Sequence, residues 1–290
     1  MDNSNTVKSA LVMEGGGMKG MFTCGVIDVL MENDVTFDVS IGVSAGAIFG
    51  INVKSKQPRR SLNYTKIYRN DKRYSSLSSL LKTGNYFNAE FCYHTIPDEL
   101  DVFDRETFKK NPMRFYVVAT DCKTGKPAYH LCNDAEGDNV EWIRASASIP
   151  IISRPVKIEG GEYVDGGVTD SIPFEFAKRI GCDKRVLILT KEQGYRAKKT
   201  KFMPFIKYAC KKYPALVDDI KRRRDVYNRQ MQEIERLEKT GDIFVIRPSK
   251  PLDMTVADKR VEKLQRAYDL GRTVTEESLP ALLRYLGKDC

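Results

Sequence analysis

A five-residue turn, Gly42-Val43-Ser44-Ala45-Gly46, lies between two apolar runs and constrains the fold of this chain most. Residues 37–41 predict a strand, and residues 47–51 predict the first part of a helix that begins at Ala45. The two glycines permit a tight turn, because side chains there would clash with the neighbouring backbone. The first N–H groups of the helix favour negative charge at the serine oxygen. We therefore predict that Ser44 is a nucleophile, and a glycine-rich turn of purely structural use is the alternative.

A glycine-rich segment upstream, residues 10–20, predicts a strand, a loop and the start of a helix over residues 21–30. Such a loop points several N–H groups in one direction, which suits a phosphate or an oxyanion. The spacing Gly15-x-Gly17-x-x-Gly20 also satisfies the dinucleotide fingerprint, so a nucleotide-binding module is an alternative. Against it, the second strand ends on the Ser44 turn instead of a ribose-binding acid. Lys19 is followed by glycine, which excludes a Walker loop.

A serine nucleophile needs a base, and the chain offers two histidines, His94 and His130. Neither lies in the turn-rich type of segment that delivers a catalytic side chain to the edge of a sheet. Asp165 ends a short strand and is followed by two glycines that permit a close backbone approach. An ordinary aspartate pKa of about 3.9 is too low for this role, so the site must raise it, as a partly dry cleft does. We predict Asp165 as the base, with a hairpin turn as the structural alternative.

Together these segments resemble the patatin-like phospholipases, which are serine acyl hydrolases with a Ser-Asp dyad. The family's oxyanion motif resembles residues 15–20, its nucleophile motif residues 42–46, and its Asp-Gly motif residues 165–167. Residues 119–121, residues 145–150 and Pro173 are similar to secondary traits of the family. The resemblance covers residues 9–190, and three motifs in the family's order are far more specific than any one of them.

The resemblance implies a role for each matching residue. Ser44 would attack an ester carbonyl, and Asp165 would take its proton and return it to the leaving alcohol. The N–H groups of Gly15, Gly16 and Gly17, with that of Ala45, would hold the oxyanion. Lys19 occupies the family's basic position, where it would fix the loop or attract a phosphate headgroup.

The function expected from this resemblance is hydrolysis of lipid carboxylic esters, of phospholipase A or lipid-esterase type. No metal and no organic cofactor is expected. A lipid-binding regulator that kept the pocket and lost turnover is the alternative from another class. The presence of both Ser44 and Asp165 speaks against it, since an inactive relative could have lost either residue.

The alternation of elements predicts an α/β fold. Residues 115–119 and 185–189 are short aliphatic runs, typical of strands buried on both faces of a parallel sheet. With helical stretches between the strands, this pattern and the resemblance predict a three-layer α/β/α sandwich with a mostly parallel sheet and further C-terminal helices. Residues 54–110 are polar and turn-prone, which predicts a surface insertion, with a lid over the acyl chain as the alternative.

The composition of the sequence changes after Thr190. We expect residues 1–190 to form the catalytic core and residues 191–290 a basic helical extension packed on the same body. Between residues 196 and 224, eleven Lys or Arg stand against two Asp, an excess of +9 that equals the net charge of the whole chain. The extension also predicts a strand over residues 242–248 and two closing helices, over residues 261–270 and 275–286.

The basic segment 196–224 is interleaved with aromatic residues, which predicts peripheral contact with an anionic membrane. A solvated helix face is the alternative. Nucleic acid is not expected as a partner, because no recognised binding module accompanies the basic residues.

The remaining signals bear on the compartment and on metals. Seven cysteines without a Cys-x-x-Cys pair favour a reducing compartment, and Cys92 with His94 lacks the second pair that a metal site needs. Residues 40–53 are too few to span a bilayer. The first six residues lack the pattern of a secretory signal, and Cys290 is not placed for prenylation. We expect a cytoplasmic protein, with peripheral contact at the inner membrane face.

Overall fold

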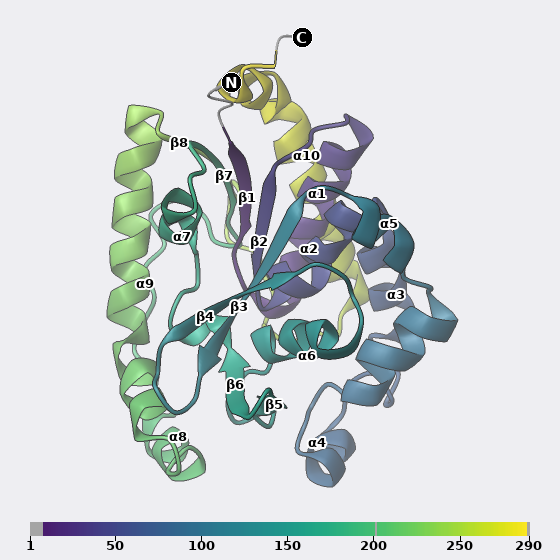
Figure 1. Ribbon diagram of the computed structural model, residues 1–290, viewed down its shortest axis with the longest axis vertical. Coiled ribbons are helices and arrows are strands. Elements are labelled where there is room, and N and C mark those ends of the chain that lie inside the picture. Colours follow the sequence, from purple (N-terminus) through teal and green to yellow (C-terminus); the bar gives the residue numbers. More distant parts are fainter. Residues whose placement is uncertain (1–7, 201, 289–290) are drawn as a thin grey trace, which may run out of the picture.

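The computed structural model of this chain describes residues 8–200 and 202–288, so the first six residues and Cys290 lie outside it. Helices cover both faces of a central sheet, which confirms the three-layer α/β/α sandwich (Figure 1). The parallel strands run toward the lower end of Figure 1, so their carboxyl ends lie on the side of helices α4 and α8. In α/β folds of this kind, ligands bind beyond the carboxyl ends of the strands.

The sheet has the strand order β5-β6-β3-β2-β1-β7-β8, with β4 paired to β3 off this path. Strands β3, β2, β1, β7 and β8 are mutually parallel, and β4, β5 and β6 are antiparallel to their neighbours, so the predicted mostly parallel sheet is confirmed. The strands are β1 (Ser9–Met13), β2 (Val39–Val43), β3 (Arg114–Asp121), β4 (Pro127–Cys132), β5 (Val156–Ile158), β6 (Gly161–Asp165), β7 (Lys184–Ile188) and β8 (Ile243–Ile246).

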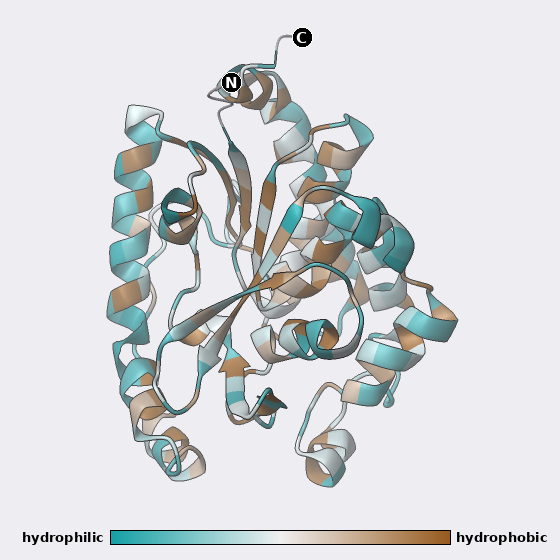
Figure 2. Ribbon diagram, viewed as in Figure 1, coloured by the Kyte–Doolittle hydropathy of each residue, from teal (hydrophilic) through white to brown (hydrophobic). Residues whose placement is uncertain are grey.

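Side chains alternate along β1 between two hydrophobic cores, as the pleat of a strand requires. Leu11 and Met13 pack on the face covered by α1, α2, α5, α6 and α10, and Ala10 and Val12 on the face covered by α7 and α9. The central strands are accordingly mostly hydrophobic in Figure 2. The α-helices are α1 (Met21–Glu32), α2 (Ala45–Ser55), α3 (Arg60–Tyr68), α4 (Leu77–Thr83), α5 (Arg105–Lys110), α6 (Gly137–Ser146), α7 (Phe174–Arg179), α8 (Met203–Ala209), α9 (Pro214–Thr240) and α10 (Val261–Leu286). Single turns of 3-10 helix cover Gly17–Gly20 and Gly166–Val168, and a π-helix covers Phe91–Leu100.

The two predicted closing helices are one continuous helix, α10, and the predicted break between them is wrong. Gly271 lies buried inside α10, where a Cβ would come within 2.2 Å of the Phe22 carbonyl oxygen of α1. On the facing side, a Cβ on Gly25 would come within 2.0 Å of the Tyr268 carbonyl oxygen. Gly271 therefore permits a close approach of two helices and does not end one.

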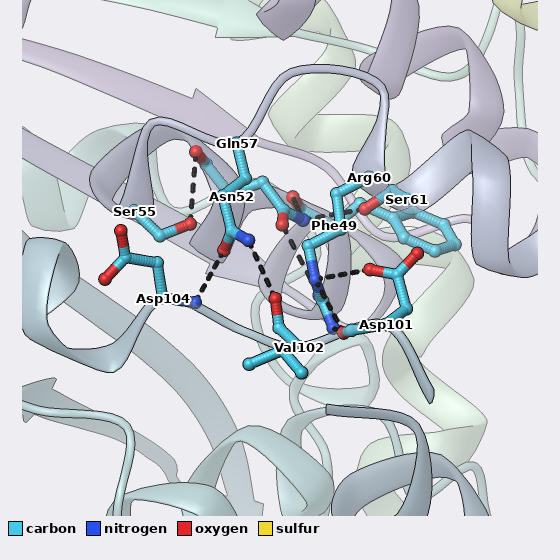
Figure 3. Close-up of polar contacts among 9 residues, drawn as sticks. All are labelled: Phe49, Asn52, Ser55, Gln57, Arg60, Ser61, Asp101, Val102 and Asp104. Carbon is cyan, nitrogen blue, oxygen red and sulfur yellow. Dashed lines mark hydrogen bonds and ion pairs between the residues drawn. The ribbon is translucent and has the colours of Figure 1, made fainter. Parts of the chain in front are cut away.

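Residues 54–110 include α3, α4, the π-helix and α5, joined by loops. The expectation of a surface insertion is corrected, because buried side chains of this segment belong to a hydrophobic core and line a cavity. A polar network ties this segment to α2 (Figure 3). Arg60 Nε lies 2.9 Å from Asp101 Oδ1, and the amide of Asn52 donates to Ser61 Oγ at 2.7 Å. The side-chain amide of Gln57 donates to the Val102 carbonyl at 2.9 Å. Arg60 is buried between the rings of Tyr64 and Phe103.

Residues after Thr190 pack on the same sheet. β8 pairs in parallel with β7, α9 covers one face, and α10 lies along α1 on the other. The domain boundary at residue 190 stays a prediction. In residues 8–200 and 202–288, no helix combines the length and the hydropathy that a bilayer crossing requires.

Candidate active site

The pairing register along β3 brings the two predicted catalytic residues together. On one edge of β3, Val43 of β2 pairs with Val118, and Asp165 of β6 pairs with Ala119, the next residue along. β4 occupies the other edge, so β6 continues the line of β2. Ser44, which follows Val43, therefore lies beside Asp165 although the two are 121 positions apart in the sequence.

Ser44 stands on the predicted turn between β2 and α2. Its φ of 54° lies in the left-handed region, a conformation that costs a non-glycine residue about 1–3 kcal/mol. A Cβ on Gly46 would come within 2.4 Å of the Met13 carbonyl oxygen, which explains the glycine after the serine. The Ser44 N–H donates to Ser146 Oγ at 3.0 Å, and the Ser146 hydroxyl donates to the Val118 carbonyl at 2.6 Å. Ser146 thus fastens the strained turn to β3.

The Asp165 carboxyl is buried, with 6% of the residue exposed. Burial raises its pKa to about 6, against a partial opposing effect of the nearby Ser44 hydroxyl, the Gly167 N–H and the Arg223 guanidinium. The Gly167 N–H donates to Asp165 Oδ1 at 2.7 Å, so a backbone donor satisfies one of the two carboxylate oxygens. A short 3-10 turn, Gly166–Val168, follows Asp165, so the hairpin alternative is wrong.

The glycine loop lies directly against the serine. A Cβ on Gly15 would come within 2.9 Å of Ser44 Cβ, so only glycine permits this approach. Among the described residues, the backbone N–H groups of Gly15, Gly16 and Ala45 donate to no protein acceptor. These N–H groups, together with that of Gly17, are the ones predicted to hold an oxyanion, and this role stays a prediction.

The buried side chain of Glu14 holds the start of the glycine loop in place. One carboxylate oxygen accepts a hydrogen bond from the Tyr227 hydroxyl of α9 at 2.7 Å, and the other accepts from the Thr190 N–H at 2.5 Å. On the far side of the loop, the Met18 N–H donates to the Val256 carbonyl at 2.9 Å. The segment after residue 190 therefore holds the glycine loop from two sides.

Ser44 lines two cavities of opposite character. The first, the apolar cavity, has a volume of about 130 Å³ and is walled by α2 and by residues 60–105 and 140–153. Its apolar lining includes Ile48, Phe49, Tyr93, Ile96, Phe103 and Ile143.

The second, the basic cavity, has a volume of about 840 Å³ and also contains Asp165 and Gly15–Gly17. Its cationic lining is Lys19, Lys191, Lys198, Lys199, Lys221, Arg223 and Arg224. Its acidic lining is Glu14, Asp165 and Asp225. The side chain of Lys19 thus faces this cavity and contributes to its positive charge.

Neither histidine reaches the serine, since neither lines a cavity that contains Ser44. The His130 ring stacks on Trp142 with centroids 4.6 Å apart, and its Nε2 lies 2.7 Å from Asn139 Oδ1. His94 lies exposed on the π-helix. Across the described ranges, no group of three His, Cys, Asp or Glu side chains could hold a metal ion.

Several residues at this site were missed by sequence reasoning. Glu14 gave a signal, since an acid that ends a buried strand needs partners. Ser146 lies in a segment similar to the family pattern, but the sequence assigns it no contact. Arg223 and Tyr227 gave no signal, because α9 reaches the site only through the tertiary fold.

A family model described as patatin-like phospholipase matches residues 11–178, more than half of the chain. A second model, a domain of unknown function (DUF6363), matches residues 213–287.

The chain is 30% identical over 271 residues to the uncharacterized protein YjjU of Escherichia coli K12, covering 91% of this chain and 74% of that protein. It is 26% identical over 190 residues to the probable lipid hydrolase 463L of Invertebrate iridescent virus 6, covering 58% of this chain and 62% of the viral protein. It is 26% identical over 183 residues to lysophospholipase nte1 of Aspergillus fumigatus, covering 60% of this chain but only 11% of the fungal protein.

Among solved structures, VipD from Legionella pneumophila aligns with a TM-score of 0.45 and 13% identity, over 94% of this chain and 67% of that one. The patatin-like family model spans both the Ser44 turn and Asp165. The chain therefore belongs to the patatin-like phospholipase family and is a carboxylic ester hydrolase.

Proposed function

We propose that this chain hydrolyses carboxylic esters of lipids, of phospholipase A or lipid-esterase type, through a Ser44-Asp165 dyad. One observation supports the proposal most directly. The Ser44 hydroxyl lies near the buried carboxyl of Asp165, and burial raises the pKa of this carboxyl to about 6. A carboxylate with such a pKa is a far better base than an exposed aspartate, and it is still ionised at neutral pH.

The reaction runs in two halves. Asp165 takes the proton of Ser44 Oγ as this oxygen attacks the ester carbonyl carbon, and the N–H groups of the Gly15–Gly17 loop and of Ala45 stabilise the oxyanion. Collapse of the tetrahedral intermediate breaks the bond to the alcohol, which leaves with the proton from Asp165. Water then attacks the acyl-serine, gives its proton to Asp165, and releases the fatty acid as the proton returns to Ser44.

The two cavities suit the two parts of such a substrate. The apolar cavity would receive the acyl chain, because it offers hydrophobic and aromatic side chains up to Ser44. The basic cavity would receive the polar alcohol part of the ester.

We further propose that segment 196–224 contacts an anionic membrane, at the inner face if the protein is cytoplasmic. Phe202, which directly precedes α8, is 70% exposed, and Phe205 and Tyr208 of α8 are 55% and 73% exposed. Lysines of the same segment surround them, and aromatic rings with cationic neighbours suit the interface of an anionic bilayer. Lys201 of this segment lies outside the described residues.

A fluorophosphonate probe tests the dyad directly, because it reacts covalently only with an activated serine. We expect one label per chain, on a peptide that contains Ser44, and none in Ser44→Ala. Asp165→Asn should slow labelling at least a hundredfold.

The same experiment separates the alternatives. An unlabelled protein that still binds lipid vesicles would favour the lipid-binding regulator. An unlabelled protein that binds a nucleotide saturably would favour the nucleotide-binding module.

A further inference from the structure

Five of the seven cations that line the basic cavity have no carboxylate within ion-pair distance in the described part of the chain. Lys221 pairs with Asp218, and Arg224 pairs with Asp225. The five without such a partner are Lys19, Lys191, Lys198, Lys199 and Arg223. The cavity therefore carries an excess of positive charge that the protein itself does not neutralise.

Lys19 and Lys191 lie at the base of this cavity, beside the glycine loop, and both are half-buried. Burial lowers the pKa of Lys19, and the adjacent Lys191 ammonium lowers it further by repulsion. The carboxylates of Glu192 and Glu14 oppose this lowering of the pKa only in part, and Glu14 already accepts hydrogen bonds from Tyr227 and Thr190. Two neighbouring ammonium groups without a shared carboxylate favour an anion between them, because the anion removes their repulsion.

The chain reaches these positions from separate parts of the fold. Lys19 follows the glycine loop, Lys191 follows β7, and Arg223 projects from α9, where its Nε donates to the Gly167 carbonyl beside Asp165. Lys198 lies at the exposed mouth. The cations thus surround the space that borders Ser44 on the side away from the apolar cavity.

We propose that Lys19 and Lys191, with Lys198 and Arg223 at the mouth, form a subsite for a phosphate group. A phosphate presents several charged oxygens to such a cluster and accepts hydrogen bonds from more than one ammonium. The group could belong to the alcohol part of the ester or to free phosphate. The first case rests on the proposed function, and it makes phosphate-bearing acyl esters preferred over neutral ones.

Two water-soluble esters with the same acyl chain test the first case: octanoyl glycerol phosphate and octanoyl glycerol, both below their micellar concentrations. Monomeric substrates exclude any effect of membrane docking. We expect wild type to prefer the phosphate ester, and Lys191→Gln to lower the ratio of the two kcat/KM values by about tenfold or more. Lys239→Gln is the matched control, because it removes an exposed lysine at the far end of α9, and it should leave the ratio unchanged.

A thermal shift with inorganic phosphate tests the subsite without turnover. Millimolar phosphate should raise the Tm of wild type and of Lys239→Gln above that in sodium chloride of equal ionic strength, and Lys191→Gln should lose this rise. A rise that is lost in Lys191→Gln, without substrate preference, assigns the subsite to free phosphate.

Absence of both the substrate preference and the thermal shift overturns the subsite. If neither ester is hydrolysed, the proposed function fails, whereas the thermal shift still decides whether phosphate binds. The two failures are therefore distinguishable.

Discussion

At the scale of single residues, the proposed chemistry depends on how burial changes the pKa of one carboxyl, that of Asp165. Asp165 needs a raised pKa to serve as a base, and the structure gives it one of about 6. Ester hydrolysis should therefore fall as the pH drops through about 6, because protonated Asp165 cannot accept the serine proton. A profile of kcat/KM against pH measures this midpoint.

The identity of the base can be tested by substitution. Asp165→Asn should nearly abolish hydrolysis at pH 8. Replacing His94 and His130 together by alanine should leave the rate within about an order of magnitude, because neither ring lines a cavity with Ser44. Retained activity in Asp165→Asn, or its loss in the double histidine variant, would contradict the dyad.

The same burial predicts a cost in stability. The folded-state pKa of Asp165, about 6, lies above its ordinary value of 3.8, so the folded state binds the proton more tightly than the unfolded state does. Stability is therefore lost as the pH rises from about 4 through 6. Asp165→Asn removes the buried charge and should raise the free energy of unfolding at pH 8 by about 3 kcal/mol.

Urea unfolding at pH 8 and pH 4.5 checks this effect. The gain in Asp165→Asn should shrink at the lower pH, where Asp165 is largely protonated in the folded state. A variant that is less stable than wild type at pH 8 would show that the carboxylate is not destabilising.

Sequence reasoning found the residues of this site whose type and spacing carry the chemistry. Ser44 and Asp165 were predicted from glycine-flanked turns at strand ends, and the structure places them together through the register on β3. Their catalytic roles stay predictions. Ser146 could not be predicted as a support of the turn, because its contact with the Ser44 N–H depends on how α6 packs across β3.

At the scale of secondary-structure elements, α9 connects the C-terminal region to the proposed catalytic residue Asp165. Arg223 donates to the Gly167 carbonyl, and its positive charge lowers the pKa of Asp165 against the larger effect of burial. Arg223→Met should therefore shift the midpoint of the pH profile upward, by about half a unit. Arg223→Lys keeps the charge and should shift it less.

The two variants separate charge from packing. A loss of activity at every pH, without a shifted midpoint, would mean that Arg223 acts only by supporting the fold of the Gly166–Val168 turn.

The contact between α1 and α10 depends on two glycines that face each other's helix. Gly271→Ala should destabilise the protein by about 2–4 kcal/mol, because its Cβ would overlap the Phe22 carbonyl and force the helices apart. Thr273→Ala, at an exposed position of the same helix, is the control and should be nearly neutral. Denaturant unfolding measures both, and equal stability of the two variants would contradict the close approach.

This contact also shows where element prediction fails. A glycine within a helical pattern usually weakens the helix, so the sequence favoured a break at Gly271. Only the position of α1 reveals that the missing side chain is required. The strands of the sheet were easier to predict, because aliphatic runs buried on both faces are distinctive.

At the scale of the whole molecule, the two cavities that meet at Ser44 could not be predicted from the sequence. Their walls come from residues 60–105, from the loop after β7 and from α9, which are far apart in the chain. The sequence of segment 54–110 suggested an insertion, because its helices are short and their outer faces are polar. Its inward side chains, such as Tyr93 and Phe103, form the wall only once α3 is fastened to α2.

The same end of the molecule carries exposed hydrophobic side chains on two separate helices. Helices α4 and α8 lie at the lower end of Figure 1, beyond the carboxyl ends of the strands. Leu77 and Leu81 of α4 are 71% and 86% exposed, and Phe202 borders the basic cavity next to α8. A membrane that touches both helices would face the end of the molecule at which Ser44 follows β2.

Binding to anionic vesicles tests this orientation. Replacing Phe202, Phe205 and Tyr208 together by serine should weaken binding by about tenfold or more, because exposed rings lose their burial in the interface. Neutralising Lys198 and Lys199 should weaken it comparably at low salt, and this effect should fade at high salt, since screening already removes the attraction. Ile67→Ser on α3 is the control, because Ile67 is 66% exposed outside α4 and α8. Vesicle binding that is insensitive to salt and to the aromatic variant, yet lost in Ile67→Ser, would place the membrane on another face of the molecule.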